Sequence, residues 1–237
     1  MRREISLYIS KIAQGISSSP TLAVDAKAKQ MKKEGHDIIG FGAGEPDFDT
    51  AQYIKAAGIA AITDGFTKYT PVGGTLELKN AISKYLEQGT GLLYDENEII
   101  VSNGAKHSLY NALFCLLNPG DKVIIPSPYW VSYPELVKLC GGVPVYVPTT
   151  EETGFTLKAN DLEEYIDEKT KVIILNSPNN PCGSVYTRQD LEDIAKLAIK
   201  NDIFVISDEV YEKFIYDGEE HTSIVSIDEK MVERTLV

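Results

Sequence analysis

The 237-residue chain lacks several features that mark common classes of protein. No uninterrupted apolar run approaches the roughly 18 residues of a membrane-spanning helix, and no long apolar segment follows the charged residues at its start. We therefore expect a cytoplasmic protein without a membrane partner. The three cysteines, Cys115, Cys140 and Cys182, are odd in number and widely spaced, which disfavours a disulfide framework and a metal-ligand motif.

Common catalytic and nucleotide-binding motifs are also missing. Neither H-E-x-x-H nor G-x-S-x-G occurs, and the three histidines, His36, His107 and His221, lie far apart in the sequence. Residues 40–47 contain a G-x-G but no third glycine at the required place, so we exclude a dinucleotide fingerprint. A formal net charge of −12 argues against nucleic acid as a partner. An anionic ligand therefore needs a local positive site.

From residue 98 onward, short apolar runs alternate with amphipathic stretches of helical length. The runs with β character lie at residues 98–101, 122–125, 143–147, 171–175 and 203–207. This alternation predicts an α/β fold with a mostly parallel sheet and helices on both faces. Residues 234–237 resemble the start of a further strand, so we expect the sheet to be incomplete at the C-terminus.

Two helices can be placed with their ends. Apolar residues repeat at helical spacing from Leu191 to Ala198, and Thr187 with Asp190 can cap the start of that helix. Near the N-terminus, an arm through residues 17–20 precedes a helix from about Leu22 to Glu34. We expect this N-terminal part to lie outside the main sheet.

A carboxylate and a phenol follow the apolar run at residues 203–207. Asp208 is the strongest site candidate, because a carboxylate beside a buried strand is costly unless paired. A protonated pyridine nitrogen is a suitable charge partner. The alternative is a helix cap with a solvated carboxylate.

Three other segments at strand ends fit the same kind of ligand. Backbone N–H groups at residues 102–107 can receive a phosphate if a helix starts there, although the segment can equally be an ordinary glycine-bearing turn. Trp130 can stack on an aromatic cofactor or simply pack. Asn180 can bond a ring oxygen or belong to a plain turn. Together they predict a pyridoxal phosphate pocket.

As a set, six motifs resemble those of class I pyridoxal phosphate-dependent aminotransferases, in particular the bacterial members that act on aspartate. The motifs are Gly44-Glu45-Pro46-Asp47-Phe48, Lys68-Tyr69-Thr70-Pro71-Val72-Gly73-Gly74, Asn103-Gly104-Ala105-Lys106, Pro128-Tyr129-Trp130, Asn179-Asn180-Pro181 and Ser207-Asp208-Glu209-Val210-Tyr211. The resemblance covers essentially the whole chain. It implies the type I fold of pyridoxal phosphate-dependent transferases and a homodimer with active sites at its interface. It also implies a small-domain part at residues 1–45 and a cofactor-binding large domain at residues 46–237.

The resemblance implies roles for individual residues. For the cofactor, Asp208 would hold the ring nitrogen, Asn180 and Tyr211 the ring oxygen, Trp130 the ring face, Gly104, Ala105 and Lys106 the phosphate, and Tyr69 the phosphate of the partner subunit. For the substrate, Gly44 would contact the α-carboxylate, with Trp130 and Asn180 close by, and Ser19, Thr21 and Lys106 would recognise the distal carboxylate of an acidic substrate.

The sequence departs from the family pattern in two ways. Cys182 stands where a threonine is usual. Family members continue into a segment with the Schiff-base lysine and two anion-binding arginines, and no position within residues 1–237 matches these; Lys213 and Lys230 fit no family position. We therefore identify no catalytic residue in these 237 residues and expect the chain by itself to be inactive.

The expected activity of the family is amino transfer from aspartate, or a similar L-amino acid, to 2-oxoglutarate. Amino-acid and 2-oxo-acid substrates are then the partners. The alternatives are another aminotransferase or a C–S β-lyase of the same fold that uses pyridoxal phosphate. A non-catalytic module is the third possibility.

Overall fold

The computed structural model describes residues 8–40, 42, 44, 46 and 48–237. Its internal contacts divide it into two compact units. One unit combines the residues up to Ile16 with Leu76–Val237, and the other is Ser17–Thr75. The expected domain boundary at residue 45 concerns the complete family fold and stays a prediction.

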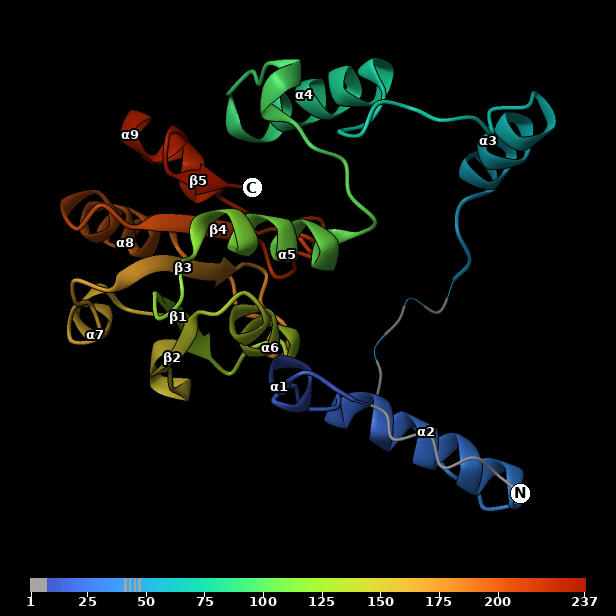
Figure 1. Ribbon diagram of the computed structural model, residues 1–237, viewed down its shortest axis with the longest axis horizontal. Coiled ribbons are helices and arrows are strands. Elements are labelled where there is room, and N and C mark those ends of the chain that lie inside the picture. The colour runs from blue at the N-terminus through green and yellow to red at the C-terminus, as the bar shows by residue number, and fades with distance from the viewer. Residues whose placement is uncertain (1–7, 41, 43, 45, 47) are drawn as a thin grey trace. The chain divides into compact units, whose positions relative to one another are not determined.

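A five-stranded sheet forms the body of the larger unit (Figure 1). Its strands are β1 (Lys122–Ser127), β2 (Val143–Pro148), β3 (Thr170–Asn176), β4 (Phe204–Asp208) and β5 (Thr235–Leu236). The order is β2-β1-β3-β4-β5, and every pair is parallel. The predicted parallel sheet is confirmed. The strand expected near the C-terminus is also present, since β5 pairs with β4 at Val205↔Thr235.

Helices cover both faces of this sheet. Along β3, Val172 and Ile174 pack with helices α5 (Ala105–Leu116) and α6 (Ser132–Leu139). The alternate residues Ile173 and Leu175 pack with the opposite layer. That layer consists of α7 (Ala159–Glu163), α8 (Arg188–Lys200), η3 (Ile224–Ser226) and α9 (Glu229–Val232). Side chains alternate between the faces of a strand, so a strand buried on both sides is continuously apolar.

The capping prediction for α8 is confirmed. The Thr187 hydroxyl accepts a hydrogen bond from the Asp190 backbone N–H at 3.2 Å and donates to the Asp190 carboxylate at 2.8 Å. Leu191, Ile194 and Ala198 are at most 3% exposed and face the sheet. The helix therefore starts where its first free N–H groups find a side-chain partner.

The strand expected at residues 98–101 is wrong. The segment begins inside a short 3₁₀ turn, η1 (Glu96–Glu98), and continues as irregular chain. The Asp95 N–H donates to the Glu98 carboxylate at 2.7 Å, while the Asp95 carboxylate accepts from the Asn97 N–H at 2.9 Å. This reciprocal cap turns the chain before a strand can pair, and only Ile99 of the apolar run is buried.

Three further elements complete the larger unit: α1 (Lys11–Gln14), α4 (Leu76–Thr90) and η2 (Glu151–Thr153). The long helix α4 bonds to the segment before η1 through the Ser83 hydroxyl, which donates to the Tyr94 carbonyl at 2.6 Å, and to η1 itself through Lys79, whose ammonium donates to the Glu96 carbonyl at 2.9 Å. In the parts of the chain that the structure describes, no helix has the length and apolar character that a membrane crossing requires.

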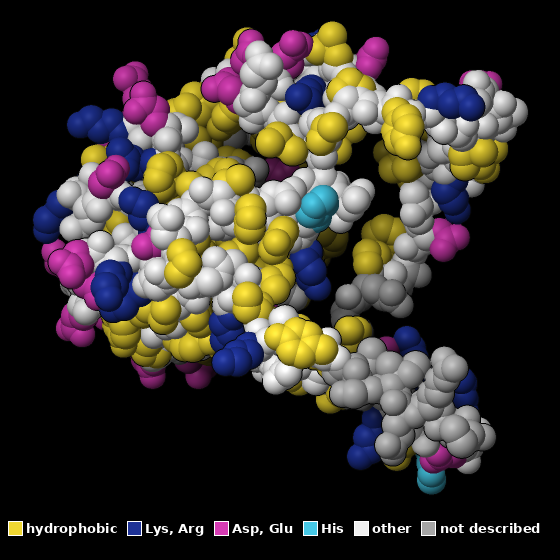
Figure 2. Space-filling view, viewed as in Figure 1, with side chains coloured by type: hydrophobic (Ala, Val, Ile, Leu, Met, Phe, Trp, Pro, Cys, Tyr) yellow, Lys and Arg dark blue, Asp and Glu magenta, His cyan; other side chains and the backbone are white. Residues whose placement is uncertain are grey.

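The unit Ser17–Thr75 contains two helices, α2 (Pro20–Lys33) and α3 (Gln52–Thr63). The N-terminal helix prediction is confirmed: Ser19 caps α2, and Gly35 follows its end with φ of 90°. Neither helix has a buried residue. Figure 2 shows hydrophobic side chains on the surface of α3.

Candidate active site

Asp208 ends strand β4, at the carboxyl edge of the sheet where ligands of α/β proteins bind. One oxygen of its partly buried carboxylate accepts a hydrogen bond from the Tyr133 hydroxyl at 2.7 Å. The other accepts from the Val210 backbone N–H at 3.3 Å. No helix starts at this point, so the helix-cap alternative is wrong and Asp208 remains a candidate for a charged ligand.

Tyr133 is a site residue that sequence reasoning missed. It lies on α6, is 2% exposed, and its ring meets Trp130 edge to face at 5.4 Å between centroids. Burial, followed by the nearby Asp208 charge, raises the pKa of the Tyr133 phenol, which keeps the proton that it donates. The available signal was its place three residues after Trp130, since a buried tyrosine needs a polar partner.

Trp130, which follows β1, and Lys106, which lies in α5, are in contact. The Lys106 ammonium lies 4.9 Å from the centroid of the Trp130 ring, within the range of a cation–π contact. Trp130 is partly buried beyond the end of β1, and Lys106 is exposed in the first turn of α5. The contact places a cation beside an aromatic face in an otherwise acidic protein.

The start of α5 presents backbone N–H groups. Gly104 occupies the cap position with φ of 85°, a conformation that only glycine adopts at little cost. The His107 ring nitrogen Nδ1 accepts from the Asn103 N–H at 3.2 Å, so this histidine orders the turn. The N–H groups of Ala105 and Lys106 belong to the first turn, which has no intrahelical acceptors and favours an anion.

Asn180 and Tyr211 follow β3 and β4. The Asn180 N–H donates to the side-chain oxygen of Asn176 at 2.7 Å, and Asn176 pairs with Asp208 in the register of the sheet. Tyr211 is 38% exposed and packs edge to face on Phe214. The carboxyl ends of the neighbouring strands β3 and β4 therefore carry Asn180, Asp208 and Tyr211 on one edge of the sheet.

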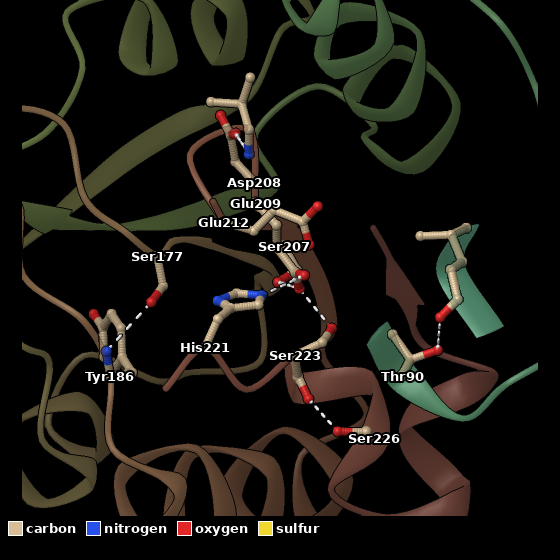
Figure 3. A network of polar contacts seen from close by, with 12 residues as sticks. Thr90, Ser177, Tyr186, Ser207, Asp208, Glu209, Glu212, His221, Ser223 and Ser226 are labelled. Carbon is tan, nitrogen blue, oxygen red and sulfur yellow. Dashed lines mark hydrogen bonds and ion pairs between the residues drawn. The ribbon is translucent and has the colours of Figure 1, made fainter. Parts of the chain in front are cut away.

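A hydrogen-bond network braces the end of β4 next to Asp208. Figure 3 shows His221 beside the Glu209 carboxylate, with a distance of 2.8 Å between Nε2 and Oε2. Hydroxyls of Ser207 and Ser223 donate to the other Glu209 oxygen at 2.7 and 2.5 Å. Glu209, Glu212 and His221 each bring a potential metal ligand within 4.8 Å of the others. These hydrogen bonds already engage both oxygens of Glu209.

The remaining predicted residues belong to the unit Ser17–Thr75. The Ser19 hydroxyl caps α2 by accepting from the Leu22 N–H at 3.4 Å, and Thr21 is exposed on the first turn of that helix. Tyr69 is fully exposed, and Gly44 has open space around it. Two residues of its motif, Glu45 and Asp47, lie outside the described residues. The substrate and phosphate roles of this unit stay predictions.

The residues of the larger unit fit a phosphorylated pyridine. A carboxylate that is held by a protonated phenol suits a ring nitrogen that carries a proton. The Trp130 indole can stack on an aromatic ring, and Lys106 lies beside it. The backbone N–H groups at the start of α5 can bind a phosphate. Asp208 and Trp130 lie at the carboxyl ends of β4 and β1, whereas Lys106 and the turn for the phosphate belong to the start of α5.

The chain has relatives among known proteins. Residues 36–237 match the family described as aminotransferase class I and II. The aspartate aminotransferase of Bacillus sp. (strain YM-2) is 54% identical over 222 residues, which are 94% of this chain and 57% of the relative. The probable aspartate/prephenate aminotransferase of Aquifex aeolicus is 45% identical over 231 residues, with 98% and 58% covered.

Solved structures give the same result. The aspartate aminotransferase from Thermus thermophilus with maleate superposes with a TM-score of 0.92 at 41% identity, covering 97% of this chain and 59% of that one. The chain thus spans less than two thirds of the length of these relatives. The family model, the sequence relatives and the fold agree, and the chain belongs to the class I and II aminotransferase family.

Proposed function

We propose that the native protein transfers an amino group from aspartate, or a similar L-amino acid, to 2-oxoglutarate with pyridoxal phosphate as cofactor. The observation that carries this proposal is the pair formed by Asp208 and Tyr133 at the carboxyl end of β4. A buried phenol that keeps its proton leaves the neighbouring carboxylate as the charged member of the pair. That charge would keep a ring nitrogen protonated.

The bound cofactor would supply the electron sink of the reaction. The chain's own residues would hold it: Asp208 at the ring nitrogen, Asn180 and Tyr211 at the ring oxygen, and Trp130 on the ring face. The N–H groups of Ala105 and Lys106, with Gly104, would donate to the phosphate at the start of α5.

Charge supports an acidic substrate. The protein carries a formal net charge of −12, so an anionic amino acid needs a local cation. Lys106 provides one beside Trp130. We propose that Lys106, with Ser19 and Thr21, recognises the distal carboxylate, and that Gly44 contacts the α-carboxylate.

We also propose that the protein works in the cytoplasm as a homodimer in which Tyr69 reaches the cofactor phosphate of the partner. The support is the apolar surface of α2 and α3, where Leu22, Ile59 and Ile62 are each at least 64% exposed. Several exposed apolar side chains on the same helices indicate a surface that another surface covers.

The native-length protein tests the function directly. Purified protein with pyridoxal phosphate should convert aspartate and 2-oxoglutarate to oxaloacetate and glutamate. A coupled dehydrogenase assay that consumes oxaloacetate measures the rate. Asp208→Ala should lower kcat by at least about a hundredfold, because it removes the charge at the ring nitrogen. Asp202→Ala changes an exposed aspartate before β4 and is the control. If the protein turns over no acidic amino acid, the substrate assignment is wrong.

A second acceptor deserves a parallel assay, because the Aquifex aeolicus relative is named an aspartate/prephenate aminotransferase. Prephenate offered in place of 2-oxoglutarate tests whether this chain shares that activity. If Lys106→Ala spares activity on aspartate, the result favours an aromatic or branched-chain aminotransferase or a β-lyase of the same fold.

Covalent attachment of the cofactor separates the enzyme from a non-catalytic module. Borohydride reduction after incubation with pyridoxal phosphate, followed by intact mass spectrometry and peptide mapping, locates any modified lysine. We expect the modified lysine to be neither Lys213 nor Lys230. A stoichiometric adduct on either residue would contradict the expectation that neither lysine occupies the Schiff-base position of the family.

A further inference from the structure

The side-chain amide of Asn176 forms hydrogen bonds with two residues that are proposed to bind the cofactor, Asp208 and Asn180. Its Nδ2 donates to the backbone carbonyl of Asp208 at 2.9 Å. Its Oδ1 accepts from the backbone N–H of Asn180 at 2.7 Å. The residue is 5% exposed and ends strand β3, so the amide is held in place by the sheet.

The contacts cross between strands that neighbour each other in the sheet. Asn176 pairs with Asp208 in the β3–β4 register, and the next backbone N–H, that of Ser177, also donates to the Asp208 carbonyl at 3.2 Å. The Asp208 main chain is therefore held from β3, while Tyr133 holds its carboxylate from α6. The loop that carries Asn180 is tied back to the same side chain.

We propose that Asn176 is a positioning residue that sets Asp208 and Asn180 at a fixed separation, so that one contacts the ring nitrogen and the other the ring oxygen of the same cofactor. This inference rests on the proposed function. A carboxamide is suited to the task because it carries a donor and an acceptor on one rigid group. An aspartate would turn an acceptor toward the Asp208 carbonyl, and an alanine would leave both partners without this bond.

Ligand discrimination tests this role without turnover. Pyridoxamine 5′-phosphate binds without a covalent bond, and its affinity for the native-length protein can be measured by titration calorimetry. The 1-deaza analogue lacks the ring nitrogen, and the 3-deoxy analogue lacks the ring oxygen. The ratio of each analogue's Kd to that of pyridoxamine 5′-phosphate reports the nitrogen contact and the oxygen contact separately. A change in overall stability affects all three ligands together and cancels in these ratios.

Three variants give distinct expectations. Asn176→Ala should lower both ratios by about tenfold, since both contact residues lose their support. Asn176→Asp keeps an acceptor for the Asn180 N–H, so the nitrogen ratio should fall more than the oxygen ratio. Asn179→Ala is the matched control: its side chain accepts from Cys182 in the same loop and bonds neither Asp208 nor Asn180, so both ratios should stay unchanged.

The outcomes separate the two proposals. If the unsubstituted protein discriminates against both analogues and Asn176→Ala retains that discrimination, Asn176 has no positioning role. If the unsubstituted protein binds all three ligands equally, the roles of Asp208 and Asn180 fail, and the proposed function falls together with this inference. An equal loss of discrimination in Asn179→Ala would show that the loop responds as a whole and would also overturn the assignment to Asn176.

Discussion

The sheet body and the helices α2 and α3 are both rich in apolar side chains, but they use them differently. In the body, Ile173, Ile194 and Val205 are completely buried between the sheet and its helices. In α3, Ile59 and Ile62 are 64% and 71% exposed, and neither α2 nor α3 contains a buried residue. The apolar content of a helix therefore does not identify the surface that it packs on.

The body is stabilised mainly by its own core. Its exposed ion pairs, such as the one between Lys196 and Asp193 on α8, add little because water screens them. The apolar residues of α3 can stabilise the native protein only when another surface covers them. The candidate site also depends mainly on the sheet body, because the residues whose hydrogen bonds support the cofactor proposal all lie there.

The largest expected difference between the two regions is in the cost of shortening an apolar side chain, measured as the loss of free energy of unfolding. Ile194→Ala in α8 should lower the free energy of unfolding by about 2–4 kcal/mol, because the side chain is completely buried. Ile59→Ala in α3 should change it by less than about 0.5 kcal/mol when both variants are compared as monomers, because Ile59 is 64% exposed in the single chain. Urea denaturation at a protein concentration that keeps the chain monomeric measures both. An equal cost for Ile59→Ala under these conditions would break the comparison and show that the single chain itself covers α3.

The polar support of the site should produce the next largest effect. Tyr133→Phe should cost about 1.5–3 kcal/mol at pH 7, because it removes a donor from the Asp208 carboxylate. Tyr53→Phe in α3 removes the hydroxyl of a tyrosine that is 77% exposed and should cost less than about 0.5 kcal/mol at the same pH.

The same variant has a pH signature. Burial raises the pKa of the Tyr133 phenol, so the folded state keeps a proton that the unfolded state releases above about pH 10. The stability that this residue contributes is complete below that pH and is lost as the pH rises further. The unsubstituted protein should therefore lose stability above about pH 10 more steeply than Tyr133→Phe, measured by urea denaturation at each pH. Parallel pH profiles would contradict this.

Two glycines should respond in opposite directions. Gly104 before α5 has φ of 85°, so Gly104→Ala should destabilise by about 1–2 kcal/mol through backbone strain. Gly58 lies inside α3 with open space around it, so Gly58→Ala should stabilise by about 0.5–1 kcal/mol. Thermal unfolding compares them. If both substitutions change the stability in the same direction, the backbone conformation of the glycine does not determine the effect.

The smallest expected effect concerns thiol reactivity within the body. Cys115 is exposed on α5, whereas burial raises the pKa of the Cys140 and Cys182 thiols. A maleimide at pH 7 should modify Cys115 about tenfold faster than the other two, as followed by peptide mass spectrometry. Equal rates would show that the body opens readily enough to expose Cys140.

Local patterns predicted much of this fold. The apolar runs of β3 and β4 identify buried parallel strands, and Thr187 with Asp190 identifies the start of α8, because these signals act between near neighbours in the chain. The same reasoning failed at residues 98–101, where the apolar run suggested a strand. The reciprocal cap between Asp95 and Glu98 turns the chain there instead.

The sequence by itself determined the family, the parallel sheet and the residue types at its carboxyl edge, because motifs and hydrophobic periodicity are written along the chain. Only the tertiary structure decided which groups hold those residues. Tyr133 meets Asp208 across 75 positions, and Asn176 meets it across 32. No local signal encodes such pairs, because the packing of α6 and the register of β3 with β4 create them.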